Sequence, residues 1–271
     1  MHPNAYQLED RLCLVTGAAG GIGLAIATAF AREGARVAML DRDAETLQAA
    51  AGNLRAAGHD VCAQACDVTD NEALEAARAA LLRHRGAETD ILVNCAGIQS
   101  PAPLAEITPA QWRRQMALNL ESYLACAQIF RRGMLARRSG AIVHVGSIQG
   151  HFPRLGAGGY SSSKAALLML SRQLAGEWGP LGIRSNVVSP GWVRTPMSAH
   201  IYADPTFAAA RIARVPLRRI GTPEDSAEAV LFLASNRARY VNGAEILVDG
   251  GLACAAFDLP SATNGGFQQQ S

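Results

Sequence analysis

The sequence predicts a single-domain α/β protein with a seven-stranded, parallel, doubly wound sheet and helices on both faces. Short β-type runs alternate with longer helical patterns from one end of the chain to the other, which is the pattern of βαβ units. Several of the short runs are nearly continuous in apolar residues, as strands covered on both faces require. Of the 271 residues, 49% are hydrophobic and 18% charged, which places the chain in the globular class.

The predicted strands all lie in one domain, residues 11–258. An N-terminal extension (1–10) precedes this domain and a flexible polar tail (259–271) follows it. A doubly wound sheet of this size commonly forms a single unit with a substantial core. The seven strands are expected at Leu12–Thr16, Arg36–Asp41, Asp60–Asp67, Ile91–Asn94, Ala141–Ser147, Arg184–Ser189 and Glu245–Asp249.

Helix ends are predicted from residues that satisfy the free backbone groups there. Thr69, Thr108 and Thr222 are each followed three residues later by an acid or amide, as in a capping box. The last two also have proline at the next position, which favours a first helical turn. Gly34 and Gly58 stand where helices should stop, ahead of strands.

Charge and composition exclude several classes of partner. The net charge is only +2 and the basic residues are spread along the chain, so nucleic acid is not expected as a partner. The six cysteines lack the paired spacing of a zinc site, so we expect buried reduced thiols and no metal. No apolar stretch is long enough to span a bilayer and the N-terminus has no signal pattern, which predicts a cytoplasmic protein without a membrane partner.

A glycine-rich segment directly follows the first predicted strand and opens a helix to about Glu33. A turn at this point of a βαβ unit must be tight, must let backbone approach a pyrophosphate, and must aim helix N–H groups at it. Glycine meets all three demands, which predicts the dinucleotide site of a Rossmann fold. The alternative is a strand-to-helix turn with no ligand. The expected cofactor contacts are Gly17, Gly21, Ile22 and Gly23.

Two aspartates end the second and third predicted strands, near the expected adenosine half of a cofactor. Asp41 is placed to accept hydrogen bonds from a ribose and to repel a 2′-phosphate, which favours NAD over NADP. Arg42 argues the other way, because a guanidinium accommodates that phosphate, whereas Gly20 leaves the loop without a cation. Asp67 and Val68 are expected to contact adenine. The alternatives are that Asp41 caps the next helix and that Asp67 belongs to the start of the following one.

A set of motifs in this order resembles the classical short-chain dehydrogenase/reductase (SDR) family, from about Leu12 to Gly251. The family usually has asparagine where this chain has Cys95, and we expect a packing substitution there. The motifs are Thr16-Gly17-x-x-x-Gly21-Ile22-Gly23, Asn94-Cys95-Ala96-Gly97, Asn119, Ser147, Tyr160-x-x-x-Lys164 and Pro190-Gly191. The resemblance implies further cofactor contacts from Asn94, Ala96, Gly97, Tyr160, Lys164, Pro190, Gly191, Val193 and Thr195.

Alcohol oxidation requires a base, and a free tyrosine with a pKa of roughly 10 is a poor one near neutrality. Lys164 follows Tyr160 by four residues in a helical segment, so both lie on one helix face, where the cation favours phenolate. The resemblance assigns Tyr160 as acid/base and Lys164 as its partner, which also holds the nicotinamide ribose. It gives Ser147 the substrate oxygen and Asn119 a proton-relaying water. Singly, each residue has a plainer reading as a surface or strand-end side chain.

The segment after Gly191 is expected, from the resemblance, to cover the substrate, with Thr195 near the cofactor carboxamide. The alternative is a plain pair of surface helices. Gln99, Gln149 and Trp192 are the expected substrate contacts. The polar residues near the expected pocket suit a hydroxylated or cyclic compound without identifying one, and they are Gln99, Gln149, His151 and Arg154.

The sequence therefore predicts an NAD-dependent oxidoreductase that interconverts a secondary alcohol and a ketone, such as a sugar, polyol or cyclic alcohol. An NADP-dependent reductase of 3-oxoacyl thioesters is the alternative among enzymes. A nucleotide-sensing or scaffold protein is the alternative from another class, and it would be expected to lack one or more of the four catalytic residues, Asn119, Ser147, Tyr160 and Lys164. The resemblance also implies a homotetramer, with helices around Trp112–Leu135 and Tyr160–Trp178 in one interface and the C-terminal strand region in another.

Overall fold

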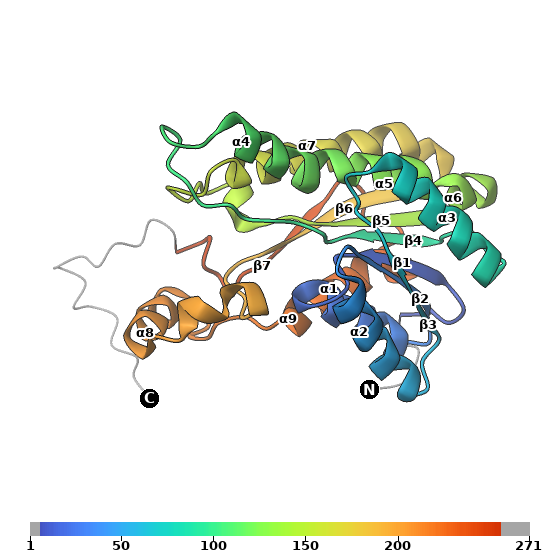
Figure 1. Ribbon diagram of the computed structural model, residues 1–271, viewed down its shortest axis with the longest axis horizontal. Helices are drawn as coiled ribbons and strands as arrows, with labels where there is room; N and C mark the ends of the chain where they lie inside the picture. Colours follow the sequence, from blue (N-terminus) through green and yellow to red (C-terminus); the bar gives the residue numbers. More distant parts are fainter. Residues whose placement is uncertain (1–5, 256–271) are drawn as a thin grey trace.

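The computed structural model describes residues 6–255, and only the backbone of 197, 200 and 201. Its seven strands form one all-parallel sheet in the order β3-β2-β1-β4-β5-β6-β7, which confirms the predicted fold class (Figure 1). The predicted tail, 259–271, lies outside the described residues, as does 1–5 of the predicted extension. The strands are β1 (Leu12–Thr16), β2 (Arg36–Asp41), β3 (Val61–Ala65), β4 (Ile91–Asn94), β5 (Gly140–Val145), β6 (Ile183–Pro190) and β7 (Glu245–Val248).

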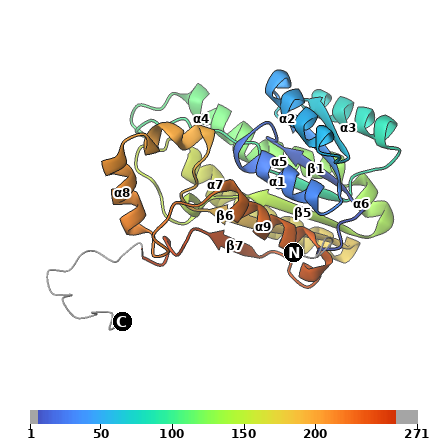
Figure 2. The same ribbon diagram turned by 90° about the horizontal axis from the view of Figure 1, so that it is seen from below.

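Helices cover both faces of the sheet, and one further helix lies at its carboxyl end (Figures 1 and 2). One layer holds α1 (Gly21–Arg32), α2 (Ala44–Ala56) and α9 (Pro223–Ala234), with α1 and α9 packed side by side. The other layer holds α3 (Asn71–Arg85), α4 (Pro109–Met116), α5 (Ser122–Phe130), α6 (Arg132–Arg137) and α7 (Tyr160–Trp178). The helix at the end is α8 (Pro205–Arg214).

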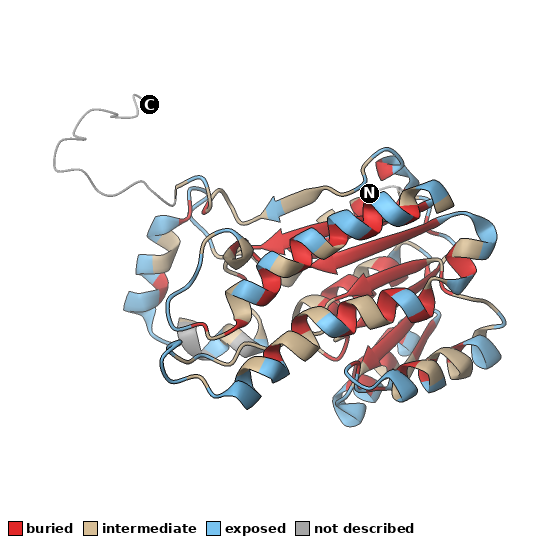
Figure 3. Cartoon of the chain, turned by 90° about the horizontal axis from the view of Figure 1, so that it is seen from above, coloured by how far each residue is buried: buried red, intermediate tan, exposed pale blue. Residues whose placement is uncertain are grey.

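Two apolar cores lie on opposite faces of the sheet, and β1 contributes to both by strand alternation. Cys13 and Val15 pack into the core beneath α1 and α9, whereas Leu12 and Leu14 pack into the core beneath α3, α5 and α7. In Figure 3 the central strands are buried along their length, whereas the helices are buried only on the sides that face the sheet. Because core side chains fill both faces of the sheet, the place that remains for a ligand is at the carboxyl ends of the strands.

The structure corrects the predicted region after β3. The strand ends at Ala65 rather than Asp67, and the Asp67 carboxylate accepts hydrogen bonds from the N–H and hydroxyl of Thr69 at 2.9 and 2.7 Å. The Thr69 hydroxyl is therefore used as a donor, and the prediction that it caps a helix is wrong. Asp70 caps α3 instead, accepting from the N–H groups of Glu72 and Ala73.

The other predicted helix ends are confirmed. Thr108 accepts from the Gln111 N–H at 3.2 Å, and the Gln111 side chain accepts from the Thr108 N–H at 2.9 Å, which forms a complete capping box. Thr222 precedes α9, and its N–H donates to the Asp225 carboxylate at 2.7 Å. Gly34 and Gly58 follow the ends of α1 and α2 with φ values of +80° and +87°, in the left-handed region that favours glycine.

Within residues 6–255 the structure contains neither a membrane-spanning helix nor a metal-binding cluster. No helix in that range combines the length and the apolar character needed to cross a membrane. Nor do three or more histidine, cysteine or acidic side chains of that range come together as a metal site would require. All six cysteines are free thiols; most are buried, as predicted, but Cys254 is exposed.

Candidate active site

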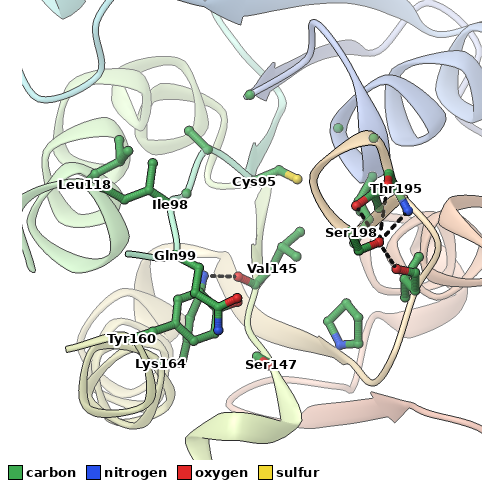
Figure 4. A pocket seen from close by; sticks show the side chains of 18 of the residues that line it. Cys95, Ile98, Gln99, Leu118, Val145, Ser147, Tyr160, Lys164, Thr195 and Ser198 are labelled. Carbon is green, nitrogen blue, oxygen red and sulfur yellow. Dashed lines mark hydrogen bonds between the residues drawn. The ribbon is translucent and has the colours of Figure 1, made fainter. Parts of the chain in front are cut away.

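A cavity of about 620 Å³ lies at the carboxyl ends of the strands, bounded by the glycine-rich loop, the start of α7 and the segment after β6. Tyr160 and Lys164 project from α7 on one side of it, and Thr195 and Ser198 lie across from them (Figure 4). Asn94 and Asn119 are the two predicted site residues that do not line it. The predicted residues that do are Gly17, Gly21, Ile22, Gly23, Asp41, Asp67, Val68, Ala96, Gly97, Gln99, Ser147, Gln149, Tyr160, Lys164, Pro190, Gly191, Trp192, Val193 and Thr195.

The glycine loop is held so tightly that two of its positions admit no side chain. A Cβ on Gly17, which has φ +68°, would lie 2.7 Å from the Ala96 Cα, and one on Gly23 would lie 2.0 Å from the Gly17 carbonyl oxygen. The Thr16 hydroxyl accepts from the N–H groups of Cys95 and Ala96 at 3.0 and 3.2 Å, which joins this turn to the end of β4. A backbone cradle at the start of α1 fits the pyrophosphate of a dinucleotide.

Asp41 faces the same cavity from the end of β2. Its carboxylate accepts from the Ala19 N–H and from the Asp43 N–H, both at 3.1 Å. Asp43, not Asp41, caps α2, so the alternative of a capping role for Asp41 is wrong. Arg42 also lines the cavity, with an exposed side chain. The carboxylate that would repel a ribose 2′-phosphate and the guanidinium that would bind one are therefore both present at the end of β2.

Asp67 lies in the turn ahead of α3 rather than in the helix. The hydrogen bonds from the Thr69 N–H and hydroxyl, together with the charges of Arg42 and Arg114, lower the pKa of the Asp67 carboxyl. Asp67 is an anion at neutral pH and lines the cavity beside Val68, as expected for a wall of the adenine pocket.

Lys164 and Tyr160 occupy the first turns of α7 with their side chains on one face. The Lys164 ammonium is 3% exposed and donates to the Val145 carbonyl at 2.8 Å and to the Tyr123 hydroxyl at 3.3 Å. Its nitrogen lies 5.8 Å from the centroid of the Tyr160 ring. Burial lowers the pKa of Lys164 to about 8, so the group is charged at neutral pH and releases its proton more readily than an exposed lysine.

Ser147 follows β5 by two residues and orients the phenol. Burial raises the pKa of Tyr160, while the hydrogen bond from Ser147 acts in the opposite direction because it favours the phenolate. The Ser147 oxygen itself accepts from the Gln149 N–H at 3.1 Å, which fixes the direction of the hydroxyl. Three of the four predicted catalytic residues are thus brought together at one wall.

Asn119 has a different surrounding from the one predicted. It lies in a turn of π-helix, Ala117–Glu121, and its Oδ1 accepts from the Ile98 N–H at 2.9 Å. Its Nδ2 donates to the Ile98 carbonyl at 2.9 Å and to the Ser163 hydroxyl at 3.2 Å. Both amide donors are engaged, so the side chain does not offer one to a relay water. Asn119 instead fixes the loop that carries Gln99.

Asn94 is fully buried and turns away from the cavity. Its amide nitrogen donates to the Tyr123 carbonyl at 3.1 Å and lies 3.2 Å from His144 Nδ1. Its neighbour Cys95 lines the cavity in its place, and burial raises the pKa of that thiol to about 12. The Cys95 thiol is therefore protonated at neutral pH, which agrees with the expected packing role.

Sequence comparisons decide the family. Residues 17–253 match the family described as Enoyl-(Acyl carrier protein) reductase. Galactitol 2-dehydrogenase (L-tagatose-forming) of Cereibacter sphaeroides is 42% identical over 250 residues, which cover 91% of this chain and 96% of that protein. The chain belongs to the short-chain dehydrogenase/reductase family.

Other relatives of this SDR protein cover a similar share of the chain. Cis-4-hydroxycyclohexanecarboxylate dehydrogenase of Sinomonas cyclohexanicum is 42% identical over 246 residues, 89% of this chain and 96% of that protein. The structure of gluconate 5-dehydrogenase from Burkholderia cenocepacia in complex with NADP and tartrate matches with a TM-score of 0.88 and 33% identity, covering 94% of this chain and 99% of that one. The predicted family is confirmed, and the SDR protein is an oxidoreductase that acts on CH–OH groups.

Two buried residues that support the SDR site, Tyr123 and His144, were not predicted, and neither was Arg211, which lines the cavity. Tyr123 receives the hydrogen bond from Lys164, and the His144 ring stacks on Tyr123 with centroids 5.7 Å apart. Burial lowers the pKa of His144 to about 3, so the ring is neutral. A histidine inside an otherwise apolar strand was an available signal. Tyr123 had none, because tyrosine is common in apolar helix segments.

Proposed function

We propose that the protein is an NAD-dependent dehydrogenase that interconverts a secondary alcohol and a ketone, with Tyr160 as acid/base, on a sugar, polyol or cyclic alcohol. The observation that carries this proposal is the meeting of Tyr160, Ser147 and the buried Lys164 at one wall of the cavity that the glycine loop bounds. The names of the relatives support the substrate range, since they include an alditol, a sugar acid and a hydroxylated ring acid.

The chain's own residues account for the proton. A bound nicotinamide supplies the hydride acceptor or donor. In the oxidation direction, the Tyr160 oxygen takes the proton of the substrate hydroxyl, and in reduction it returns that proton. Burial disfavours the phenolate and raises the pKa of Tyr160, and the Ser147 hydrogen bond acts against this effect. The Lys164 ammonium, 5.8 Å from the ring centroid, also favours the phenolate. Ser147 also stands where a substrate oxygen would gain charge.

The preference for NAD rests on Asp41. Its carboxylate is held at the end of β2 by two backbone N–H groups, and a 2′-phosphate placed beside it would face a fixed negative charge. Gly20 of the loop provides no cation. Arg42 opposes this preference and reduces it without removing the carboxylate.

Initial rates with NAD⁺ and NADP⁺, measured by nicotinamide absorbance over sugars, polyols and cyclic alcohols, test the proposal. We expect NAD⁺ to give the higher kcat/KM by about tenfold or more. Tyr160→Phe is expected to lower kcat by about 10²- to 10⁴-fold while leaving NAD affinity nearly unchanged, because the hydroxyl acts in proton transfer. Full activity of that variant would refute the acid/base assignment. A strong preference for NADP⁺ would favour the 3-oxoacyl thioester reductase instead.

A further inference from the structure

The cavity is charged unevenly along its length. Among the described residues that line it, there are two acids: Asp41 ends β2, and Asp67 lies in the turn after β3. Arg42 and Arg114 also line that end, where their charges act on Asp67. The rest of the lining contains no carboxylate, and its cationic members are Arg154, Lys164 and Arg211. The part of the cavity that remains for a substrate is thus positive.

Arg211 is held by aromatic rings rather than by an acid. Its guanidinium carbon lies 4.7 Å from the centroid of the Trp192 ring, 4.9 Å from that of Phe207 and 5.7 Å from that of Tyr202. Arg211 Nη1 donates one hydrogen bond, to the Tyr202 hydroxyl at 3.4 Å. Arg211 forms no ion pair with a residue in the range 6–255. A guanidinium held by its faces keeps N–H donors on its edge, where a carboxylate binds with two parallel hydrogen bonds.

Two amides that line the same cavity lack a partner at one polar end. Gln99 Oε1 accepts from Arg154 Nη1 at 3.4 Å, which fixes the orientation of the amide, and the shielded Gln99 Nε2 has no hydrogen-bond partner in the described part of the chain. Gln149 Oε1 is likewise shielded and without a partner there. Such atoms are costly when unpaired. Together they provide a donor and an acceptor, which suits a ligand with hydroxyl groups.

We propose that the substrate is a hydroxylated carboxylate, that Arg211 binds its carboxylate, and that Tyr160 and Ser147 act on a secondary hydroxyl of the same molecule. The inference rests on the proposed function and narrows its substrate class from alcohols in general to hydroxy acids. Gln99 and Gln149 bind further oxygens of the substrate. A neutral polyol would leave the half-buried Arg211 without a counter-charge, which is the less favourable arrangement.

The test uses two pairs of compounds that differ in the acidic group: gluconate with sorbitol, and cis-4-hydroxycyclohexanecarboxylate with cyclohexanol. Wild-type protein is expected to prefer at least one acid over its neutral partner in kcat/KM with NAD⁺. Arg211→Gln is expected to lower kcat/KM for that acid by about 10- to 100-fold, mostly through KM, and to lower it far less for the neutral partner. Arg211→Lys, which keeps the charge but loses the planar edge, is expected to fall between the two.

Arg214→Gln is the matched control. Arg214 is on the same helix and its guanidinium carbon lies 5.9 Å from the same Trp192 ring, but it does not line the cavity, so neither compound of a pair should be affected. Calorimetric titration of each acid into protein saturated with NADH, where no oxidation takes place, gives a second readout. The acid should bind wild type and Arg214→Gln and should lose affinity for Arg211→Gln.

The outcomes separate this inference from the proposed function. Turnover of neutral alcohols with NAD⁺, with neither acid preferred or bound, overturns the inference and leaves the proposed function standing. Binding of an acid through Arg211 without turnover of any alcohol supports the assignment of Arg211 as the carboxylate ligand and overturns the proposed function, together with the reaction at a hydroxyl of that acid. Three outcomes would each overturn the carboxylate assignment. The first is an equal loss for an acid and its neutral partner in Arg211→Gln, and the second is that no compound binds. The third is a preference for sorbitol 6-phosphate, added as an anion without a carboxylate, over gluconate.

Discussion

Two walls of the cavity differ in the atoms that form them, which are backbone atoms in one and side-chain atoms in the other. At the glycine-loop end the backbone forms the surface, and Gly17 and Gly23 stand where a Cβ would collide with main-chain atoms. A second wall, from Trp192 to Arg211, is formed by side chains that stack on one another. A backbone surface of that kind admits one residue type at each critical position, whereas a side-chain wall admits many. The first is therefore visible in a sequence and the second is not.

The largest effect is expected from breaking the backbone end with Gly23→Ala. The new Cβ would meet the Gly17 carbonyl oxygen at 2.0 Å, so the loop or helix α1 must shift. We expect the free energy of unfolding to fall by about 3 kcal/mol and NAD affinity to be lost. Gly20→Ala is the control for stability, because its Cβ meets nothing within 4 Å and its φ of −168° is extended. Urea unfolding of both variants measures the difference, and similar losses would contradict this account of the loop.

A smaller effect, of opposite sign, is expected from Lys164→Met, which removes the buried cation. The pKa of Lys164 is about 8 in the folded protein against an ordinary 10.5, so the unfolded chain binds more protons between these values. The free energy of unfolding of the wild type should therefore rise from pH 8 to pH 10.5, and the full penalty should be present below pH 8.

The variant should lose that rise, and its free energy of unfolding should exceed that of the wild type by about 1–2 kcal/mol at pH 7. The gain is smaller than the full penalty because the Val145 carbonyl and the Tyr123 hydroxyl lose their donor. Turnover should fall by about 10²-fold or more. Urea unfolding at pH 7, 8 and 10 provides the comparison. An unchanged pH dependence in the variant would show that Lys164 is not the group responsible.

The smallest effect is expected on the side-chain wall, from Ser198→Ala. The Ser198 hydroxyl donates to the Val193 carbonyl at 2.8 Å and accepts from the Thr195 N–H at 2.9 Å, so it ties the segment after β6 together. Its loss should cost about 1 kcal/mol and lower NAD affinity only a few-fold, because the glycine loop keeps its shape although Thr195, an expected cofactor contact, loses one hydrogen bond. Unfolding and NAD titration should show this. A loss as severe as that of Gly23→Ala would mean that the wall is as constrained as the loop.

The comparison of prediction with structure follows the same division. The parallel sheet, the glycine loop and the spacing of Tyr160 and Lys164 follow from periodicity, turn geometry and helical repeat, which are local. Thr108 was predicted as a cap and is one, but Thr69, with the same spacing, is not, because Asp67 two residues earlier competes for its hydroxyl. That competition depends on where β3 ends, which the sequence leaves open by a few residues.

Residues whose role depends on distant partners were not predictable in the same way. Asn119 was expected to support a proton-relaying water with its amide, and that amide is used by Ile98 and Ser163. Arg211 had no local signal, since the rings of Trp192 and Tyr202 that hold it come from other parts of the segment after β6. Tertiary packing decides such contacts, and one sequence does not reveal them.

The bonds between Thr16 and the turn at Cys95 and Ala96 have a consequence for how such a protein changes over generations. They hold the glycine-loop end through the Thr16 hydroxyl and two main-chain N–H groups, which substitutions on the side-chain wall leave in place. New side chains can therefore be tried there one at a time, each altering which alcohol is accepted, while descendants inherit an intact machinery for the electron carrier. A division of this kind lets one ancestral chain give rise to many substrate preferences.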